Sequence, residues 1–255
     1  MSTIGQGIPR ILTPGLAYDE LADEYDQSYK APMWQAEDAV VYGLLRGFLP
    51  EEAKVVDMGC GTGALLDHVP LRRGQYFGID ISPRMIRKAW HKHPQGMFLL
   101  SPMEDMECLL SGGFDMAVSL FGSFSYSPMP EKVISEAMRL LKPGGRIFFM
   151  AYGPRYKNRR SYILNRHKIV VPHPELPLCR LKELFSCFDD LRITGLNALV
   201  EPNFERLPAQ AIEFILRAEM ATIGRINPDG CFFRIVTGCK PCHNGKPAKT
   251  FLPRG

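Results

Sequence analysis

Apolar residues in the first fifty positions recur every three or four residues, which is the period of an amphipathic helix. Leu21 and Tyr25 lie four apart within 15–30, and the apolar residues of 35–48 repeat that spacing. Pro50 follows the second segment and ends it. The pattern therefore predicts two N-terminal helices, at 15–30 and 35–48.

Short apolar runs that stop at glycine or polar residues replace this period from residue 54 onward. Such runs are typical of buried strands, and the segments between them keep the helical spacing. Strands that alternate with helices across short loops form a parallel sheet covered on both faces, so we expect an α/β fold. The expected strands are 54–58, 75–80, 97–100, 114–120, 146–151, 191–199 and 232–237. The expected helices after residue 50 are 62–69, 83–91, 130–141, 181–188 and 208–223.

Three segments show neither period. Residues 1–14 read as a flexible lead, and the tail from Lys240 is rich in Pro, Gly and Lys and reads as loose. Residues 153–178 are basic and rich in proline, so we expect an insertion or lid after the fifth strand.

Composition narrows the function classes only slightly. The 255 residues fit one large domain, and a net charge of +4 from 31 basic and 27 acidic residues does not by itself indicate a nucleic-acid partner. No apolar stretch approaches ~18 residues, and residues 1–14 do not resemble an export signal. Seven scattered cysteines are expected to be free thiols. We expect a cytoplasmic protein without a membrane span.

A glycine-rich turn is the strongest candidate for a ligand site. Gly59, Gly61 and Gly63 lie between an expected strand and an expected helix, where an open α/β sheet usually binds a nucleotide. Asp80 ends the next strand, and a carboxylate there accepts hydrogen bonds from ribose hydroxyls. The glycines alone also fit dinucleotide enzymes. Asp57, two residues before the first glycine, can form an ion pair with a cationic amino group, which favours an adenosyl ligand over a dinucleotide.

Three segments together resemble the class I S-adenosylmethionine (SAM)-dependent methyltransferase family. They are Asp57-x-Gly59-x-Gly61-x-Gly63, Gly78-Ile79-Asp80-Ile81-Ser82 and Leu141-Lys142-Pro143-Gly144-Gly145. The resemblance covers 16–150, and Phe232 to Pro241 looks like the family's last antiparallel strand. It implies a Rossmann-like fold, with a seven-stranded, mostly parallel sheet between helices. We expect 1–50 to form an N-terminal helical cap, 51–152 the SAM-binding core, and 153–255 a substrate-facing insertion and the final strands of the same domain.

The resemblance also implies a SAM site in which Asp57 and the backbone of 59–63 hold the methionine part and Asp80 holds the ribose. One position departs from the family pattern: Pro102 stands where an acidic residue usually contacts the adenine amino group, so Met103 or Glu104 is expected to replace it. The expected cofactor residues are Tyr18, Tyr25, Asp57, Gly59, Cys60, Gly61, Gly63, Asp80, Ile81, Met85, Met103, Glu104 and Leu120.

The acceptor is expected beyond the carboxyl end of the fourth strand. The (Asn/Asp)-Pro-Pro-(Tyr/Phe) loop of enzymes that methylate nucleic-acid bases is absent there, which argues against a nucleic-acid substrate. Aromatic rings suit a flat or cationic small molecule. The expected acceptor-binding residues are Tyr29, Trp34, Phe121, Phe124 and Tyr126. For Trp34, Phe121 and Phe124, a place in the core is the alternative.

Methyl transfer needs mainly in-line positioning, because the sulfonium is already an activated donor. A base is required only when the acceptor must lose a proton early. Tyr126, His167 and His173 are the candidates, although both histidines fall in the expected lid, where a solvated side chain is the alternative.

The leading hypothesis is thus a small-molecule N- or O-methyltransferase of secondary metabolism, monomeric or homodimeric, that acts on a planar or aromatic acceptor. Three alternatives stay open: an RNA or protein methyltransferase that uses the basic run 155–160, a binding module without transfer, and a nicotinamide oxidoreductase. Cys239-Lys240-Pro241-Cys242-His243 matches a haem-attachment pattern, but it follows the last strand without an export signal, and we expect no metal site.

Overall fold

The computed structural model describes residues 9–154, 162–199, 204 and 206–242. Seven strands form one sheet in the order β4-β3-β2-β5-β6-β9-β8. The strand β9 is antiparallel to both of its neighbours, and the other pairings are parallel. The expected α/β fold with a mostly parallel seven-stranded sheet and a reversed last strand is confirmed. The strands are β2 (Val55–Met58), β3 (Tyr76–Asp80), β4 (Met97–Leu100), β5 (Phe114–Ser119), β6 (Leu141–Tyr152), β8 (Asp189–Leu196) and β9 (Phe233–Cys239).

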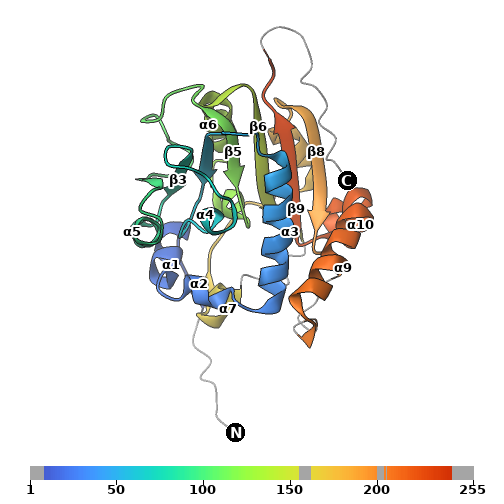
Figure 1. The fold of residues 1–255 in the computed structure, drawn as a ribbon. Coiled ribbons are helices and arrows are strands. Elements are labelled where there is room, and N and C mark those ends of the chain that lie inside the picture. The colour runs from blue at the N-terminus through green and yellow to red at the C-terminus, as the bar shows by residue number, and fades with distance from the viewer. Residues whose placement is uncertain (1–8, 155–161, 200–203, 205, 243–255) are drawn as a thin grey trace.

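Helices cover both faces of this sheet. One apolar cluster joins α3, α4 and α9 to one face, and a second joins α6 and α8 to the other. Figure 1 shows α3 in front of the sheet, with α1, α2 and α7 gathered at one end of the molecule. The helices are α1 (Pro14–Leu21), α2 (Tyr25–Ser28), α3 (Pro32–Phe48), α4 (Leu65–His68), α5 (Pro83–Lys92), α6 (Pro130–Leu140), α7 (Tyr162–Arg166), α8 (Leu178–Leu184), α9 (Ala209–Ala221) and α10 (Ile223–Ile226).

Two expected helices are shorter than the pattern predicts. The segment 15–30 breaks after Leu21 into α1 and α2. The helix expected at 62–69 keeps only α4, because Gly61 and Gly63 take φ angles of +54° and +77°, which a right-handed helix does not allow. The glycine-rich loop is therefore longer than the sequence pattern predicts.

Two segments that were expected to be loose are paired. The strand β1 (Arg10–Ile11) in the N-terminal lead lies parallel to β7 (Ile169–Val170) in the segment after β6. Lys240 is also fixed, since its ammonium donates to the carbonyls of Met138 and Leu141 at 2.7 Å each. The insertion is thus tied to the N-terminal segment. The basic run 155–160 lies outside the described residues.

Candidate active site

A cavity of about 600 Å³ opens at the carboxyl ends of β2, β3, β4 and β5. The loops that follow these strands line it, and α1 and α2 close it from the side of the N-terminus. This is the edge at which open α/β sheets bind their ligands. Its volume suits a nucleoside-sized molecule with a small second ligand.

Gly59 lets the loop after β2 pass close to the loop after β5. Its φ is +83°, and a Cβ there would lie 2.5 Å from the Cβ of Ser123. The backbone N–H groups of Gly59 and Cys60 both donate to the carbonyl of Ile79, at 2.7 and 2.9 Å. Gly59, Cys60 and Gly61 line the cavity, whereas Gly63 turns away from it and packs against His93 and Phe98.

Asp57 lies in the central strand β2 and reaches the cavity from below the glycine loop. The residue is 3% exposed, and its carboxylate accepts a hydrogen bond from the Tyr76 hydroxyl at 2.8 Å. Burial raises the pKa of Asp57 to about 7, although the Tyr76 hydrogen bond opposes the shift and the nearby Asp80 adds to it. A cationic group in the cavity would favour the ionised carboxylate.

Asp80 ends β3 and joins two neighbouring loops. One carboxylate oxygen accepts from the N–H of Gly61 at 2.8 Å, and the other accepts from the N–H of Ser82 at 2.9 Å. Burial raises the pKa of Asp80, and the backbone donors of Ser82, Gly61 and Ile81 oppose that shift. Each oxygen keeps a second lone pair for a ligand hydroxyl. Ile81 and Met85 continue the same wall.

Two carboxylates of the N-terminal segment attach α1 and α2 to loops that line the cavity. Asp19 accepts from the Ser82 hydroxyl and from the N–H of Arg84, both at 2.8 Å, at the start of α5. Asp26 accepts from the hydroxyl of Thr62, in the glycine loop, at 2.6 Å. The sequence pattern did not reveal the contact of Asp19, because an acidic residue on the polar side of a helix is usually solvated.

Residues 101–105, directly after β4, form a further part of the cavity wall. Met103 and Glu104 both face the cavity, as does Pro102. Glu104 accepts a hydrogen bond from the Ser127 hydroxyl, which in turn accepts from the N–H of Met129 at 3.1 Å. The loop after β4 is thereby joined to the loop after β5.

Aromatic residues line the cavity beside the glycine loop. The Tyr18 hydroxyl donates to the Tyr126 hydroxyl at 3.2 Å, and Tyr126 donates to Tyr152 at 3.5 Å. Phe121 has a φ of +49°, which is rare for a bulky residue and is typically retained at functional sites. The aromatic residues of this wall are Tyr18, Tyr25, Tyr42, Phe121 and Tyr126.

Five other predicted acceptor or catalytic residues lie outside the cavity lining. Phe124 is fully buried against Phe149 and Phe185, so the core alternative describes it better than acceptor binding. It lies in a 3₁₀ turn, at Ser123–Tyr126, that turns Tyr126 toward the cavity and Phe124 toward the core. Tyr29 and Trp34 contact each other edge to face behind Tyr25.

The two candidate histidines have other neighbours. The Nε2 of His167 lies 2.6 Å from a carboxylate oxygen of Glu24. The ring of His173 contacts the rings of Tyr126 and Tyr152, with centroids 5.9 and 6.0 Å apart. Of the three candidate bases, only Tyr126 lines the cavity.

Within the described residues, no three His, Cys, Asp or Glu side chains come together as a metal-binding group would require. No helix in that part of the chain is long and apolar enough to cross a bilayer. Leu120, another predicted cofactor residue, also lines the cavity.

Residues 56–149 match a family model described as a methyltransferase domain. A ubiquinone biosynthesis O-methyltransferase of Chromobacterium violaceum is 33% identical over 115 residues, which make up 44% of this chain and 48% of that protein. A dTDP-3-amino-3,4,6-trideoxy-alpha-D-glucopyranose N,N-dimethyltransferase of Streptomyces venezuelae is 30% identical over 49% of this chain and 54% of its own length. The chain thus spans about half the length of these relatives.

Solved structures match over most of the chain. A SAM-dependent methyltransferase of Thermotoga maritima, described as a possible histamine N-methyltransferase, superimposes with a TM-score of 0.62 at 15% identity, over 89% of this chain and 99% of that one. The [4+2]-cyclase SpnF superimposes with a TM-score of 0.60 at 18% identity, over 92% of this chain and 99% of that one. Identities this low show a shared fold and leave the reaction open.

Proposed function

We propose, from the premise that residues 56–149 form a class I SAM-dependent methyltransferase domain, that this chain transfers the methyl group of SAM to a nitrogen or oxygen of a small, planar or aromatic metabolite. One observation carries the proposal. A single cavity is lined by the two carboxylates and glycine loop of a SAM site and by five aromatic side chains. The donor and a flat acceptor therefore have room to meet inside it.

The residues present fit SAM. Asp57 supplies a buried carboxylate for the cationic amino group of the methionine part. Gly59, which has no side chain, lets the backbone of the loop lie close to the ligand. Asp80 retains lone pairs for the ribose hydroxyls, and residues 101–105 form a wall for the adenine. When bound, SAM supplies the activated methyl group.

The protein's own contribution is orientation and exclusion of water. The rings of Tyr18, Phe121 and Tyr126 offer flat apolar surfaces that stack on a planar acceptor. The Tyr126 hydroxyl lines the cavity and can receive a hydrogen bond from the acceptor; as the phenolate, after losing its own proton to solvent, it would take up a proton that must leave. A binding geometry of this kind accounts for much of the rate of such reactions.

Asp80→Ala tests the cofactor half of the proposal. We expect the variant to bind S-adenosylhomocysteine (SAH) at least about tenfold more weakly than wild type, because it loses the ribose acceptors and the link between the Gly61 and Ser82 loops. Isothermal titration calorimetry measures the change. The control is Asp115→Ala, which removes a carboxylate at the opposite end of the sheet, paired with Lys142. Unchanged affinity in Asp80→Ala contradicts the ribose assignment.

Turnover distinguishes an enzyme from a protein that only binds SAM. The chain is incubated with methyl-labelled SAM and a metabolite extract, and the label is followed by mass spectrometry. Label in small molecules supports the proposal, label in RNA or protein supports the polymer alternative, and tight SAM binding without transfer supports the binding module. This measurement is needed because a [4+2]-cyclase shares the fold.

Tyr126→Phe tests the acceptor half. We expect kcat to fall about tenfold or more with an acceptor that must lose a proton, because removal of an acid–base group typically costs at least that much. The affinity for SAH is expected to stay within about twofold, since the ring remains. Tyr29→Phe, outside the cavity lining, is the matched control. A normal kcat in Tyr126→Phe removes the hydroxyl from the mechanism.

A further inference from the structure

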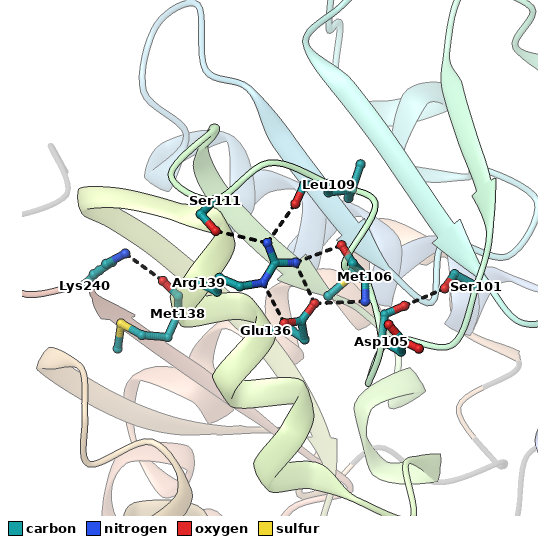
Figure 2. Close-up of polar contacts among 9 residues, drawn as sticks. All are labelled: Ser101, Asp105, Met106, Leu109, Ser111, Glu136, Met138, Arg139 and Lys240. Carbon is teal, nitrogen blue, oxygen red and sulfur yellow. Dashed lines mark hydrogen bonds and ion pairs between the residues drawn. The ribbon is translucent and has the colours of Figure 1, made fainter.

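Arg139, on α6, is outside the cavity lining, yet all five of its N–H groups bind the loop that follows β4 or the neighbouring Glu136. Its Nε and one Nη2 hydrogen reach the two oxygens of Glu136, both at 2.7 Å. The other three reach the carbonyls of Met106 at 2.8 Å and Leu109 at 2.7 Å, and the hydroxyl of Ser111 at 3.2 Å. Figure 2 shows the guanidinium enclosed by these partners. We call this arrangement the Arg139 clamp.

Glu136 completes the clamp from the same helix. One of its oxygens also accepts from the N–H of Met106 at 2.9 Å, so the α6 pair binds both the N–H and the carbonyl of that residue. The hydrogen bond from Arg139 lowers the pKa of Glu136, which keeps it ionised and paired. The planar fork of arginine makes this geometry possible, and lysine cannot reproduce it.

The loop is also held by apolar packing. Met106 is fully buried in the second apolar cluster, and Met103 and Leu109 pack against that cluster. The preceding strand β4 has four residues and lies at the edge of the sheet, where it pairs only with β3. Residues 101–113 contain neither helix nor strand. Because the loop has no regular secondary structure, its hydrogen bonds to α6, together with this packing, fix its position.

The same loop supplies the wall of the cavity at residues 101–105. The Ser101 hydroxyl donates to the carbonyl of Asp105 at 2.6 Å, immediately before the clamped Met106. Glu104 is joined through Ser127 to the N–H of Met129, directly before α6. The end of the wall at Glu104 and Asp105 is thus attached to one helix and its leading turn, whereas the N–H of Ser101, at the other end, donates to the carbonyl of Asp80 in β3 at 3.0 Å. Displacement of residues 106–111 would move Met103 and Glu104.

We propose that Arg139 is a positioning residue for the purine of SAM. It holds the loop after β4 so that residues 101–105 form the wall against the adenine, at a site where Pro102 provides neither an acidic side chain nor an N–H donor. This inference rests on the proposed SAM site. Loss of the clamp should therefore reduce recognition of the base, while contacts to the ribose and the methionine part remain.

The test compares SAH with S-inosylhomocysteine, in which an oxo group replaces the adenine amino group. Wild type should bind SAH about tenfold or more tightly than the inosine analogue, because a site built for one hydrogen-bonding edge rejects the other. Arg139→Met should lose about tenfold in affinity for SAH and less than about twofold for the analogue, so that the preference nearly disappears. Arg139→Lys keeps the charge and should lose most of the preference too.

Val133→Ala is the matched control. Val133 is fully buried on the same helix and contacts the core, so its truncation weakens the packing of α6 without removing a hydrogen bond of the clamp. It should keep the wild-type preference for SAH. An equal loss of preference in Val133→Ala, or an unchanged preference in both Arg139 variants, overturns the inference. Thermal unfolding shows whether each variant is folded. The charge-conserving Arg139→Lys then shows whether a folded variant has lost the preference.

Wild type supplies the last distinction. If it binds neither ligand, the proposed SAM site fails and the inference fails with it. If it binds SAH and the analogue equally, the wall does not distinguish adenine from hypoxanthine, and the inference alone is overturned. A preference present in wild type and Val133→Ala but absent from both Arg139 variants supports it.

Discussion

Asp57→Asn is expected to bind SAH about a hundredfold more weakly than wild type at pH 8, and to unfold at a higher temperature than wild type at that pH when no ligand is present. The loss of affinity follows from the proposed pairing of Asp57 with the amino group of the ligand. Removing one partner of a buried charge pair typically costs about 2–5 kcal/mol. An amide cannot offset the cation, although it has nearly the same shape.

The gain in stability follows from the pKa of Asp57. Its pKa is about 7 in the folded chain, against a usual value of 3.8. The folded state therefore holds this proton more tightly than the unfolded state, and the stability gained in this way is lost as the pH rises through about 7. Above that pH wild type carries a buried, ionised carboxylate, and asparagine removes its cost.

The pH series makes the prediction specific. The difference in melting temperature between Asp57→Asn and wild type should be largest above about pH 7, and it should shrink steadily as the pH is lowered from there toward 3.8, where the unfolded state also binds the proton. Wild-type affinity for SAH should fall as the pH drops below about 7, because binding must then remove that proton. Asp115→Asn, outside the cavity lining, should show neither trend. A melting difference that is the same at every pH would contradict the assigned cause.

The features that the sequence predicted correctly are those that depend on neighbours along the chain. The apolar runs predicted the strands of the sheet, because the central runs are buried on both faces by helices that the same pattern predicts. The mostly parallel seven-stranded sheet with its antiparallel last strand came from the family resemblance, since local spacing does not specify which strands pair. Asp57 and Asp80 line the cavity because each belongs to a parallel strand whose carboxyl end meets the same edge.

The features that the sequence could not predict depend on contacts between distant segments. Asp19 lies 63 residues from Ser82, and Arg139 lies 33 residues from Met106. Both are charged residues on helices, where solvent exposure is the usual state. Phe121 and Phe124 have the same chemistry, and only the turn between them places one in the cavity wall and the other in the core.

Gly59→Ala is expected to abolish measurable SAH binding and to destabilise the protein by about 3 kcal/mol, a sum of backbone strain and overpacking. The φ of Gly59 is +83°, and the added Cβ would lie 2.5 Å from the Cβ of Ser123. The loops after β2 and β5 would have to separate, and both line the cavity. Chemical denaturation and calorimetry measure the two effects.

Gly74→Ala separates the two causes. Its φ of +84° is nearly the same, but its added Cβ would meet nothing within 4 Å. It should therefore cost only about 1–2 kcal/mol, from the left-handed backbone, and leave SAH affinity unchanged. Adding Ser123→Gly to Gly59→Ala removes the atom that clashes and should restore part of the lost stability. Equal costs for the two alanine variants would mean that backbone conformation alone, and not the close approach of the two loops, requires glycine at position 59.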